Sequence, residues 1–489
     1  MRSRIAPEII FLRESDAPTL QGRLAAAIVR AILESRARPG TRLPSSRRLS
    51  QSLGLSRMTV TLVYQDLVSQ GYLETIPRSG VAVAATVPHR RIRATTVRRN
   101  ERPPDWKGWL SDHRLPRRVI RKPTNWRDFR FPFIYGQADP ALFDHNAWRD
   151  CARRALGTRD FASLAADRYG ADDPLLIDYI CSNTLPRRGI AARPDEVLVT
   201  LGAQNALFLA VELLARADRL AVTEEPGYPD FAETLRRAQS PTTFLPVDDR
   251  GLRPCDLPGN TRLVIITPSH HIPTGATMPV ARRRELIGLA TERDFLIIED
   301  DYDFEMSYLA PPAPALKSLD DEGRVIYLGS FSKSLFPGLR IGYMVAPAEL
   351  VAQARALRSI MLRHPPSHLQ RITAYFLALG HYDAHIVRLR QAMKCRRNIL
   401  EQAIAGSSLQ IEGAAASGGS SIWVSGPGTG DSATLADRLV ADSVLIEPGA
   451  VFFETPPEPC PLFRLGYGSI HEDAIAEGIA LIDRAVQTA

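Results

Sequence analysis

Between residues 196 and 333, short apolar runs alternate with longer segments that have the spacing of helices. The runs EVLVTLG (196–202) and DFLIIEDDYD (294–303) are strand-like, whereas AQNALFLAVELLARA (203–217) and ARRRELIGLATER (281–293) are helix-like. Strands that alternate with helices predict an α/β fold with a mostly parallel sheet covered on both faces. In such sheets, ligands bind beyond the carboxyl ends of the strands.

Polar or conformationally special residues stand at the ends of five such strand-like runs. They are Gly202, Glu224–Tyr228, Ser269–His271, Asp300–Tyr302 and Ser330–Lys333. Because parallel strands end at the same edge of a sheet, these five ends predict one polar pocket.

Lys333 follows an apolar run directly, so a partly dry site would lower its pKa and make its amine able to form a Schiff base. Hydrogen-bond donors for a phosphate come from Ser330, Ser332 and Arg340. The backbone amides of Ala203 and Gln204, at a helix N-terminus after Gly202, would add to them.

Two further side chains suit a heteroaromatic ring. Asp300 would keep a pyridinium nitrogen charged, and Tyr228 offers an aromatic face for stacking. An aldehyde, a phosphate and a protonated pyridine are the functional groups of pyridoxal 5′-phosphate (PLP). Each residue alone is better explained as structural, but the joint order Gly202, Tyr228, Asp300, Tyr302, Lys333, Arg340, Arg464 favours PLP.

The segment from about residue 131 to 489 resembles the fold-type I aminotransferases in its motifs EDDYD (299–303) and GSFSKSLFPGLRIGY (329–343). This resemblance implies that Tyr302 lies near the phenolic oxygen of PLP and that Arg464 binds the α-carboxylate of a ligand. Aminotransferases usually read N-P-x-G after the middle strand, but here Ile272 precedes Pro273. The departure argues against efficient transamination, although the nearby His271 could take the place of the missing asparagine.

The first 85 residues have a different pattern. Helical spacing over residues 18–35 places Leu20, Leu24, Ile28 and Ile32 on one face. Two short helices follow, the first beginning at Ser45 or Ser46 and ending at Gly54, the second beginning at Ser56. A hairpin with a turn at residues 77–80 completes a winged helix-turn-helix (α+β).

The stretch LPSSRRLSQSLGLSRMTVTLVYQDLVSQGYL (43–73) resembles the winged helix of the GntR superfamily of bacterial regulators. The resemblance implies that six residues lie at double-stranded DNA: Arg47, Ser56, Arg57 and Thr61 from the helices, and Arg78 and Ser79 from the wing.

Net charge separates the front of the chain from the rest. Residues 1–85 carry +6, residues 86–130 carry +10 and residues 131–489 carry −9. The proline-containing stretch 86–130 has no sustained helical or strand-like spacing of apolar residues and is predicted to be a linker. The domains are therefore expected at 1–85, 86–130 and 131–489. The basic front is expected to meet a polyanion, although solvated surface arginine explains the charge equally well.

A winged helix joined by a linker to an aminotransferase-like domain resembles the MocR/GabR-type transcriptional regulators. The resemblance implies a homodimer, usually head to tail, that binds promoter DNA. It also implies sensing of a small amino compound, or of PLP itself, through aldimine chemistry at Lys333. The alternative is a PLP-dependent aminotransferase with an accessory DNA-binding domain.

The remaining expectations concern compartment and metals. Five scattered cysteines without a C-x-x-C pair indicate a reducing, cytoplasmic location and no structural metal. The sequence has no apolar run of about 18 residues that could span a membrane.

Overall fold

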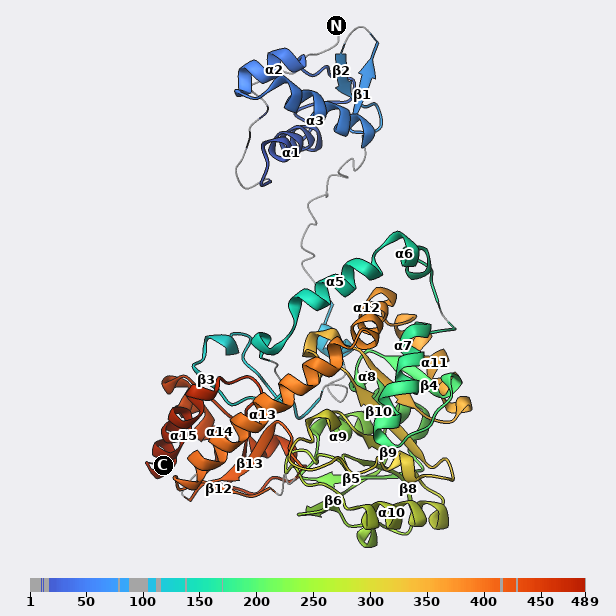
Figure 1. The fold of residues 1–489 in the computed structure, drawn as a ribbon, viewed down its shortest axis with the longest axis vertical. Coiled ribbons are helices and arrows are strands. Elements are labelled where there is room, and N and C mark those ends of the chain that lie inside the picture. Colours follow the sequence, from blue (N-terminus) through green and yellow to red (C-terminus); the bar gives the residue numbers. More distant parts are fainter. Residues whose placement is uncertain are drawn as a thin grey trace. The chain divides into compact units, whose positions relative to one another are not determined.

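The computed structural model describes residues 10, 12, 17–77, 80–87, 104–110, 116–136, 139–168, 170–413, 417–427 and 430–488. The chain divides into two compact units, residues 1–110 and 111–489 (Figure 1). The second unit thus begins inside the predicted linker, and the domain boundaries at residues 85 and 130 stay predictions.

The first unit is a three-helix bundle with a hairpin. Its elements are α1 (Leu20–Leu33), α2 (Ser46–Leu53), α3 (Arg57–Ser69), β1 (Leu73–Ile76) and β2 (Gly80–Val83), with the two strands antiparallel. The predicted helix ends are confirmed, because Ser45 and Ser56 accept hydrogen bonds from the amides of Arg48 and Thr59, and Gly54 takes φ 64° after α2. This is the predicted winged helix.

The inward faces of these helices also follow the sequence pattern, with one exception. Leu24, Ile28 and Ile32 pack in the core of the unit together with the inward residues of α3. Leu20 has the same helical spacing, but it is 56% exposed. As the first residue of α1, it lies before the point where the helix reaches the core.

The second unit is built on an eight-stranded sheet of order β4-β11-β10-β9-β8-β5-β6-β7. The strands are β4 (Val197–Thr200), β5 (Leu220–Glu225), β6 (Thr242–Asp248), β7 (Gly251–Leu252), β8 (Thr261–Ile266), β9 (Leu296–Asp300), β10 (Val325–Ser330) and β11 (Gly342–Val345). The pairs β6–β5, β5–β8, β8–β9 and β9–β10 are parallel, as predicted. The antiparallel β11, between β10 and β4, was not foreseen.

Both faces of this sheet are covered, which explains its continuous apolar runs. Successive residues of β9 pack in different hydrophobic clusters. Ile298 packs with residues of α8 and α11, whereas Ile297 packs with residues of α10. The helices that follow β4, β5 and β8 are α8 (Ala203–Leu214), α9 (Pro229–Arg237) and α10 (Val280–Arg293), and α11 is Ala348–Leu362. The other α-helices described between residues 139 and 406 are α5 (His145–Ala155), α6 (Thr158–Leu164), α7 (Pro174–Tyr179), α12 (Ser367–Ala378) and α13 (His381–Ala405), whereas the short α4 (Trp106–Trp109) belongs to the first unit.

A smaller four-stranded sheet follows near the C-terminus, in the order β12-β13-β16-β15. Its strands are β12 (Gln410–Ile411), β13 (Ser421–Ser425), β15 (Glu447–Pro448) and β16 (Phe463–Gly466), and its helices are α14 (Ser432–Leu439) and α15 (Glu472–Gln487). The early segment β3 (Phe131–Pro132) pairs in parallel with β14 (Val444–Leu445). Phe133 then bonds to Leu445 and Gly466, so the first residues of this unit run beside the end of β16.

Candidate functional site

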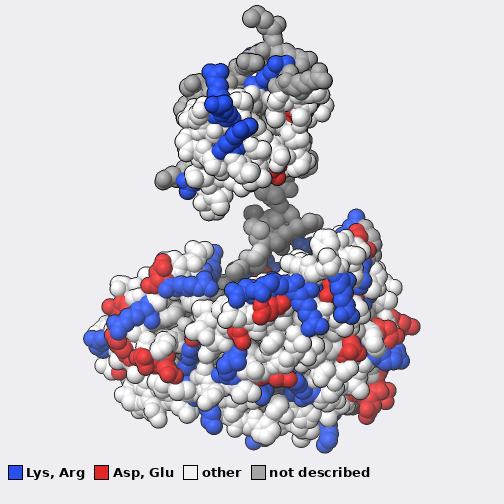
Figure 2. Space-filling view, turned by 45° about the horizontal axis from the view of Figure 1, so that its top comes forward, with Lys and Arg blue, Asp and Glu red and all other residues white. Residues whose placement is uncertain are grey.

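The described residues expected at DNA lie on α2 and in the first half of α3, including its N-cap. Arg47 and Arg57 are exposed, Thr61 is half-buried, and Figure 2 shows several Lys or Arg side chains on one visible face of this unit. Ser56 is exposed, but its hydroxyl oxygen already accepts from Thr59 N at 3.0 Å, so it holds the start of α3 in place. Arg78 and Ser79 lie outside the described residues.

In the second unit, the predicted polar residues gather at the carboxyl edge of the large sheet. Leu328 and Asp300 are register partners on β10 and β9, and β10 ends at Ser330, so Asp300, Ser330 and Lys333 follow two adjacent strands. The Ser330 hydroxyl accepts from the amide of Ser332 at 3.1 Å, while the buried Ser332 hydroxyl has no hydrogen-bond partner among the described residues.

The N-terminus of α8 meets Arg340 at the same edge. Gly202, with φ 76°, precedes Ala203 and gives this helix no side-chain cap. A Cβ at Gly202 would stand 3.1 Å from the guanidinium carbon of Arg340, and one at Gly342 would stand 2.8 Å from the amide nitrogen of Ala203. The two glycines therefore permit uncapped helix amides, including those of Ala203 and Gln204, to lie beside a cation. This combination suits an anion.

Asp300 is a buried carboxylate whose Oδ1 has no partner among the described residues. Burial, with the neighbouring carboxylates Asp301 and Asp303, raises the pKa of Asp300 to about 8. Asp301 is not free to turn away, because its Oδ2 accepts from Arg188 at 2.7 Å and from the Tyr327 hydroxyl at 2.8 Å. No ion pair within the described residues holds Asp300, and the positive charge of Lys333 offsets only part of the rise in its pKa.

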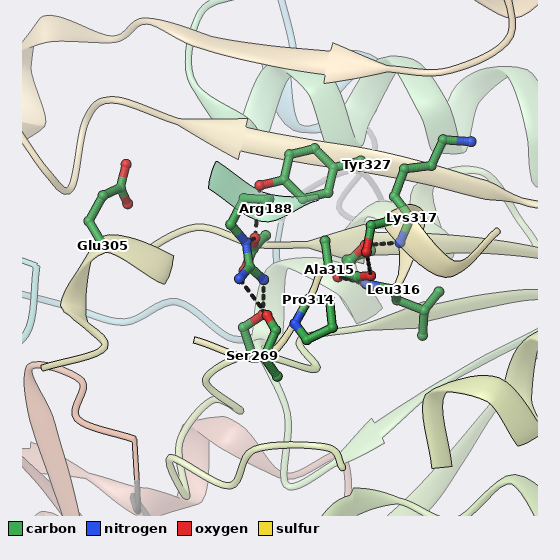
Figure 3. Close-up of polar contacts among 12 residues, drawn as sticks. Arg188, Ser269, Glu305, Pro314, Ala315, Leu316, Lys317 and Tyr327 are labelled. Carbon is green, nitrogen blue, oxygen red and sulfur yellow. Dashed lines mark hydrogen bonds and ion pairs between the residues drawn. The ribbon is translucent and has the colours of Figure 1, made fainter. Parts of the chain in front are cut away.

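Arg188, the partner of Asp301, belongs to a buried polar network (Figure 3). Arg188 also donates to the Ser269 hydroxyl at 2.9 Å, and the Glu299 carboxylate accepts the amides of Leu316 and Lys317 at 2.8 Å each. Each of these polar groups is partnered, so the network fixes the end of β9 rather than offering a binding site.

Three predicted ring-contacting residues lie nearby with their own hydrogen bonds. The Tyr302 hydroxyl donates to the carbonyl of His270 at 2.9 Å, and that of Tyr228 donates to Asp230 at 2.9 Å. His271 Nδ1 lies 2.7 Å from the Thr274 hydroxyl. Burial lowers the pKa of His271 to about 3, so it is a neutral imidazole.

Lys333 has the properties of a reactive amine. Burial, then the positive charges of Lys122 and Arg464, lower the pKa of Lys333 to about 8. Its Nζ lies 4.5 Å from the centroid of the Tyr135 ring, and a cavity of about 50 Å³ opens beside it, lined in part by Gly136 and Asp303. A large fraction of neutral amine near pH 8 is what nucleophilic attack on a carbonyl requires.

Arg464 is also at the site, but it has an internal partner. It is 2% exposed, and its Nε donates to Glu447 Oε2 at 2.8 Å. Glu447 and Arg464 are direct register partners on β15 and β16. The guanidinium carbon stacks over the rings of Tyr135 and Phe452 at 4.4 and 4.7 Å.

Sequence reasoning missed four residues around Lys333: Lys122, Tyr135, Gly136 and Glu447. No hydrophobic period or sequence motif points to the site in the segments that contain Tyr135, Gly136 and Glu447. Lys122 had one available signal, since the chain has only five lysines among 61 basic residues.

Known families match both units. The profile for bacterial regulatory proteins of the gntR family matches residues 20–83, and the profile for aminotransferase class I and II matches residues 176–479. The transcriptional regulator TauR of Rhodobacter capsulatus is 51% identical over 483 residues, which cover 99% of this chain and 100% of that protein. This chain is a transcriptional regulator of the MocR family.

Other relatives agree with that assignment. The probable rhizopine catabolism regulatory protein MocR of Rhizobium meliloti is 29% identical, with 96% of this chain and 94% of that protein covered. Among solved structures, the kynurenine aminotransferase of Pyrococcus horikoshii superposes with a TM-score of 0.69 at 25% identity, covering 78% of this chain and 98% of that one. The predicted combination of a GntR winged helix with a fold-type I aminotransferase-like domain is confirmed.

Two other kinds of site are absent from the part of the chain that the structure describes. Across the described residues, no helix is long and apolar enough to cross a membrane. Within the same residues, no group of three or more His, Cys, Asp or Glu side chains could hold a metal ion.

Proposed function

We propose that the large domain of this MocR-family regulator binds PLP and senses a small amino compound, or PLP itself, at Lys333. The observation that carries the proposal is the buried Asp300 carboxylate, with a pKa raised to about 8 and an Oδ1 without a hydrogen-bond partner among the described residues, near an amine whose pKa is lowered to about 8. A protonated pyridine nitrogen would satisfy the first group and an aldehyde the second.

The other residues fit the remaining parts of PLP. Ser330, Ser332, Arg340 and the amides of Ala203 and Gln204 would hold the phosphate. Tyr228, His271 and Tyr302 would lie against the ring and its phenolic oxygen. When bound, PLP supplies an aldehyde that condenses reversibly with primary amines.

Sensing would use the exchange of one amine for another. The Lys333 amine would hold the cofactor until a ligand amine replaces it, and Arg464 would bind the anionic end of that ligand. To regulate, this exchange must favour one arrangement of the DNA-binding units over another, a coupling typically worth about 1–3 kcal/mol. We further propose a cytoplasmic head-to-tail homodimer on promoter DNA, contacted through Arg47, Ser56, Arg57, Thr61, Arg78 and Ser79.

The test is a visible absorbance scan of the purified full-length chain with PLP, followed by borohydride reduction and mass analysis. We expect an absorbance band that shifts when one amine is added, a PLP-derived mass on Lys333, and neither in Lys333→Met. A colourless protein with no added mass on Lys333 would refute the cofactor proposal.

A second function, an aminotransferase with an accessory DNA-binding domain, is supported by the shared fold. His271 and Ile272 stand where aminotransferases usually have the asparagine of N-P-x-G. His271 is neutral, with Nδ1 against the Thr274 hydroxyl and Nε2 without a hydrogen-bond partner among the described residues. Multiple-turnover amino transfer from an amino acid to a keto acid would favour the enzyme. Specific, salt-dependent DNA binding that one amine alters would favour the regulator.

A further inference from the structure

Residues 116–122, here called the connector, lead from the first unit along the chain and are fastened to the large domain. The amides of Arg117 and Arg118 donate to the Glu233 carboxylate of α9 at 3.0 and 3.1 Å. The Arg118 guanidinium pairs with Glu454 at 2.5 Å. Ile120 packs on the apolar cluster that contains Tyr135 and Tyr302. The connector therefore has a defined position at the site.

The last residue of the connector, Lys122, reaches the centre of this site. Its Nζ donates to the carbonyl of Tyr135 and lies 3.5 Å from Glu447 Oε1. A Cβ built on Gly136 would stand 3.5 Å from Lys122 Nζ and 2.5 Å from Lys333 Nζ. Glycine at this position, with φ 74°, thus lets two of the five lysines of the chain approach one another.

The charges around Glu447 do not balance. Glu447 Oε1 faces Lys122 while Oε2 accepts from Arg464, so one carboxylate serves two cations. Glu447 therefore neutralises only one of these two positive charges. The Lys122 side chain is 23% exposed, whereas that of Arg464 is buried. A buried or half-buried surplus charge favours binding of an ion of opposite sign.

We propose that Lys122 is a ligand-binding residue, which together with Arg464 binds the acidic end of a small amino acid whose amine meets Lys333. This inference rests on the function proposed above and narrows its ligand class. The ligand carries a primary amine and, a few bonds away, a single anionic group such as a carboxylate or a sulfonate. A compact lysine ammonium can turn toward such a group, whereas the Nε of Arg464 stays bonded to Glu447.

The position of Lys122 in the chain gives the contact a consequence. A ligand anion competes with Glu447 for Lys122, and Lys122 lies four residues after Arg118, in the only covalent path to the DNA-binding unit. Ligand binding would therefore weaken the Lys122–Glu447 contact that attaches the end of the connector to the large domain. The ligand is read by the same segment that joins the two units.

The test uses the full-length, PLP-loaded chain and its variants Lys122→Met and Lys122→Gln, with Lys394→Met as the control. Lys394 is an exposed lysine on α13, so this control loses the same charge away from the site. The probes are 3-aminopropanoate, 4-aminobutanoate and 2-aminoethanesulfonate, with propylamine as an amine that lacks the anion. Affinities come from calorimetry, and circular dichroism checks that each variant folds.

We expect both Lys122 variants to bind the tightest anionic probe about 10- to 100-fold more weakly, the range for loss of a charged hydrogen bond. Propylamine should change by less than about twofold, and Lys394→Met should match the wild type. Hydrogen exchange at the Arg117 and Arg118 amides should change when the wild type binds that probe, but not with propylamine.

Three results would overturn the inference. Equal weakening of propylamine and the anionic probes would show that Lys122 only shapes the site. Unchanged binding in both Lys122 variants, or a wild type that takes up PLP but prefers no anionic amine over propylamine, would exclude a role in anion recognition. These results leave PLP binding intact, whereas a wild type that takes up no PLP refutes the proposed function itself.

Discussion

Asp300→Asn in the PLP-free chain should make stability less sensitive to pH. Asp300 is buried, and its pKa rises from an ordinary value of 3.8 to about 8 in the folded protein. A carboxyl whose folded pKa is raised binds more protons in the folded than in the unfolded state, so its contribution to stability falls as pH rises between these values. Asparagine cannot titrate and lacks this loss.

The magnitude follows from the size of the shift. At pH 7 the Asp300 carboxyl is ionised in the unfolded chain and mostly protonated in the folded protein. Because pH 7 lies about 3 units above the pKa in the unfolded chain, ionisation stabilises the unfolded state by about 4 kcal/mol relative to the folded one. For a domain of about 360 residues, with an unfolding entropy of about 2.1 cal/mol/K per residue, this equals a Tm difference of about 5 °C.

The assay is the Tm of the large-domain transition from pH 4 to pH 8 for the wild type, Asp300→Asn and the exposed control Asp442→Asn. We expect similar Tm values for wild type and Asp300→Asn near pH 4 and a gap that widens to about 5 °C by pH 7. Added PLP should narrow the gap, because a ring nitrogen would give Asp300 a positive partner. Parallel curves without PLP would refute the account of a buried, unpartnered carboxyl.

Two further predictions concern the first unit. Tyr64→Phe should lower the free energy of unfolding of this unit by about 1–2 kcal/mol, because the buried carbonyl of Pro44 loses the tyrosine hydroxyl that donates to it at 2.8 Å. Urea unfolding would measure this loss, with Tyr72→Phe at a half-buried tyrosine as the control. Arg57→Ala should reduce the slope of log affinity against log salt concentration for a bound promoter fragment by about 1, as expected for one lost phosphate contact. Arg216→Ala, an exposed arginine of the large domain, should leave that slope unchanged, and an unaltered slope in Arg57→Ala would remove this residue from the DNA interface.

Much of the fold was readable because local patterns agree with the tertiary structure. The serine caps at Ser45 and Ser56 and the glycine after α2 mark helix ends through hydrogen bonds that span only three residues. The parallel strands could be found because burial on both faces demands unbroken apolar runs. The short antiparallel β11 escaped notice, since its four residues are preceded only by the three-residue 3-10 helix Pro337–Leu339 and not by an α-helix.

Sequence order alone determined which chemical groups stand at the strand ends, because a residue that follows a buried parallel strand has only one edge of the sheet to occupy. Asp300, Ser330 and Lys333 belong to that class. The tertiary structure decided which charges surround the Lys333 amine. Lys122, Glu447 and Arg464 come together through pairing of β3 with β14 and of β15 with β16. The first of these pairs joins residues 313 positions apart (444 − 131), which no periodicity encodes.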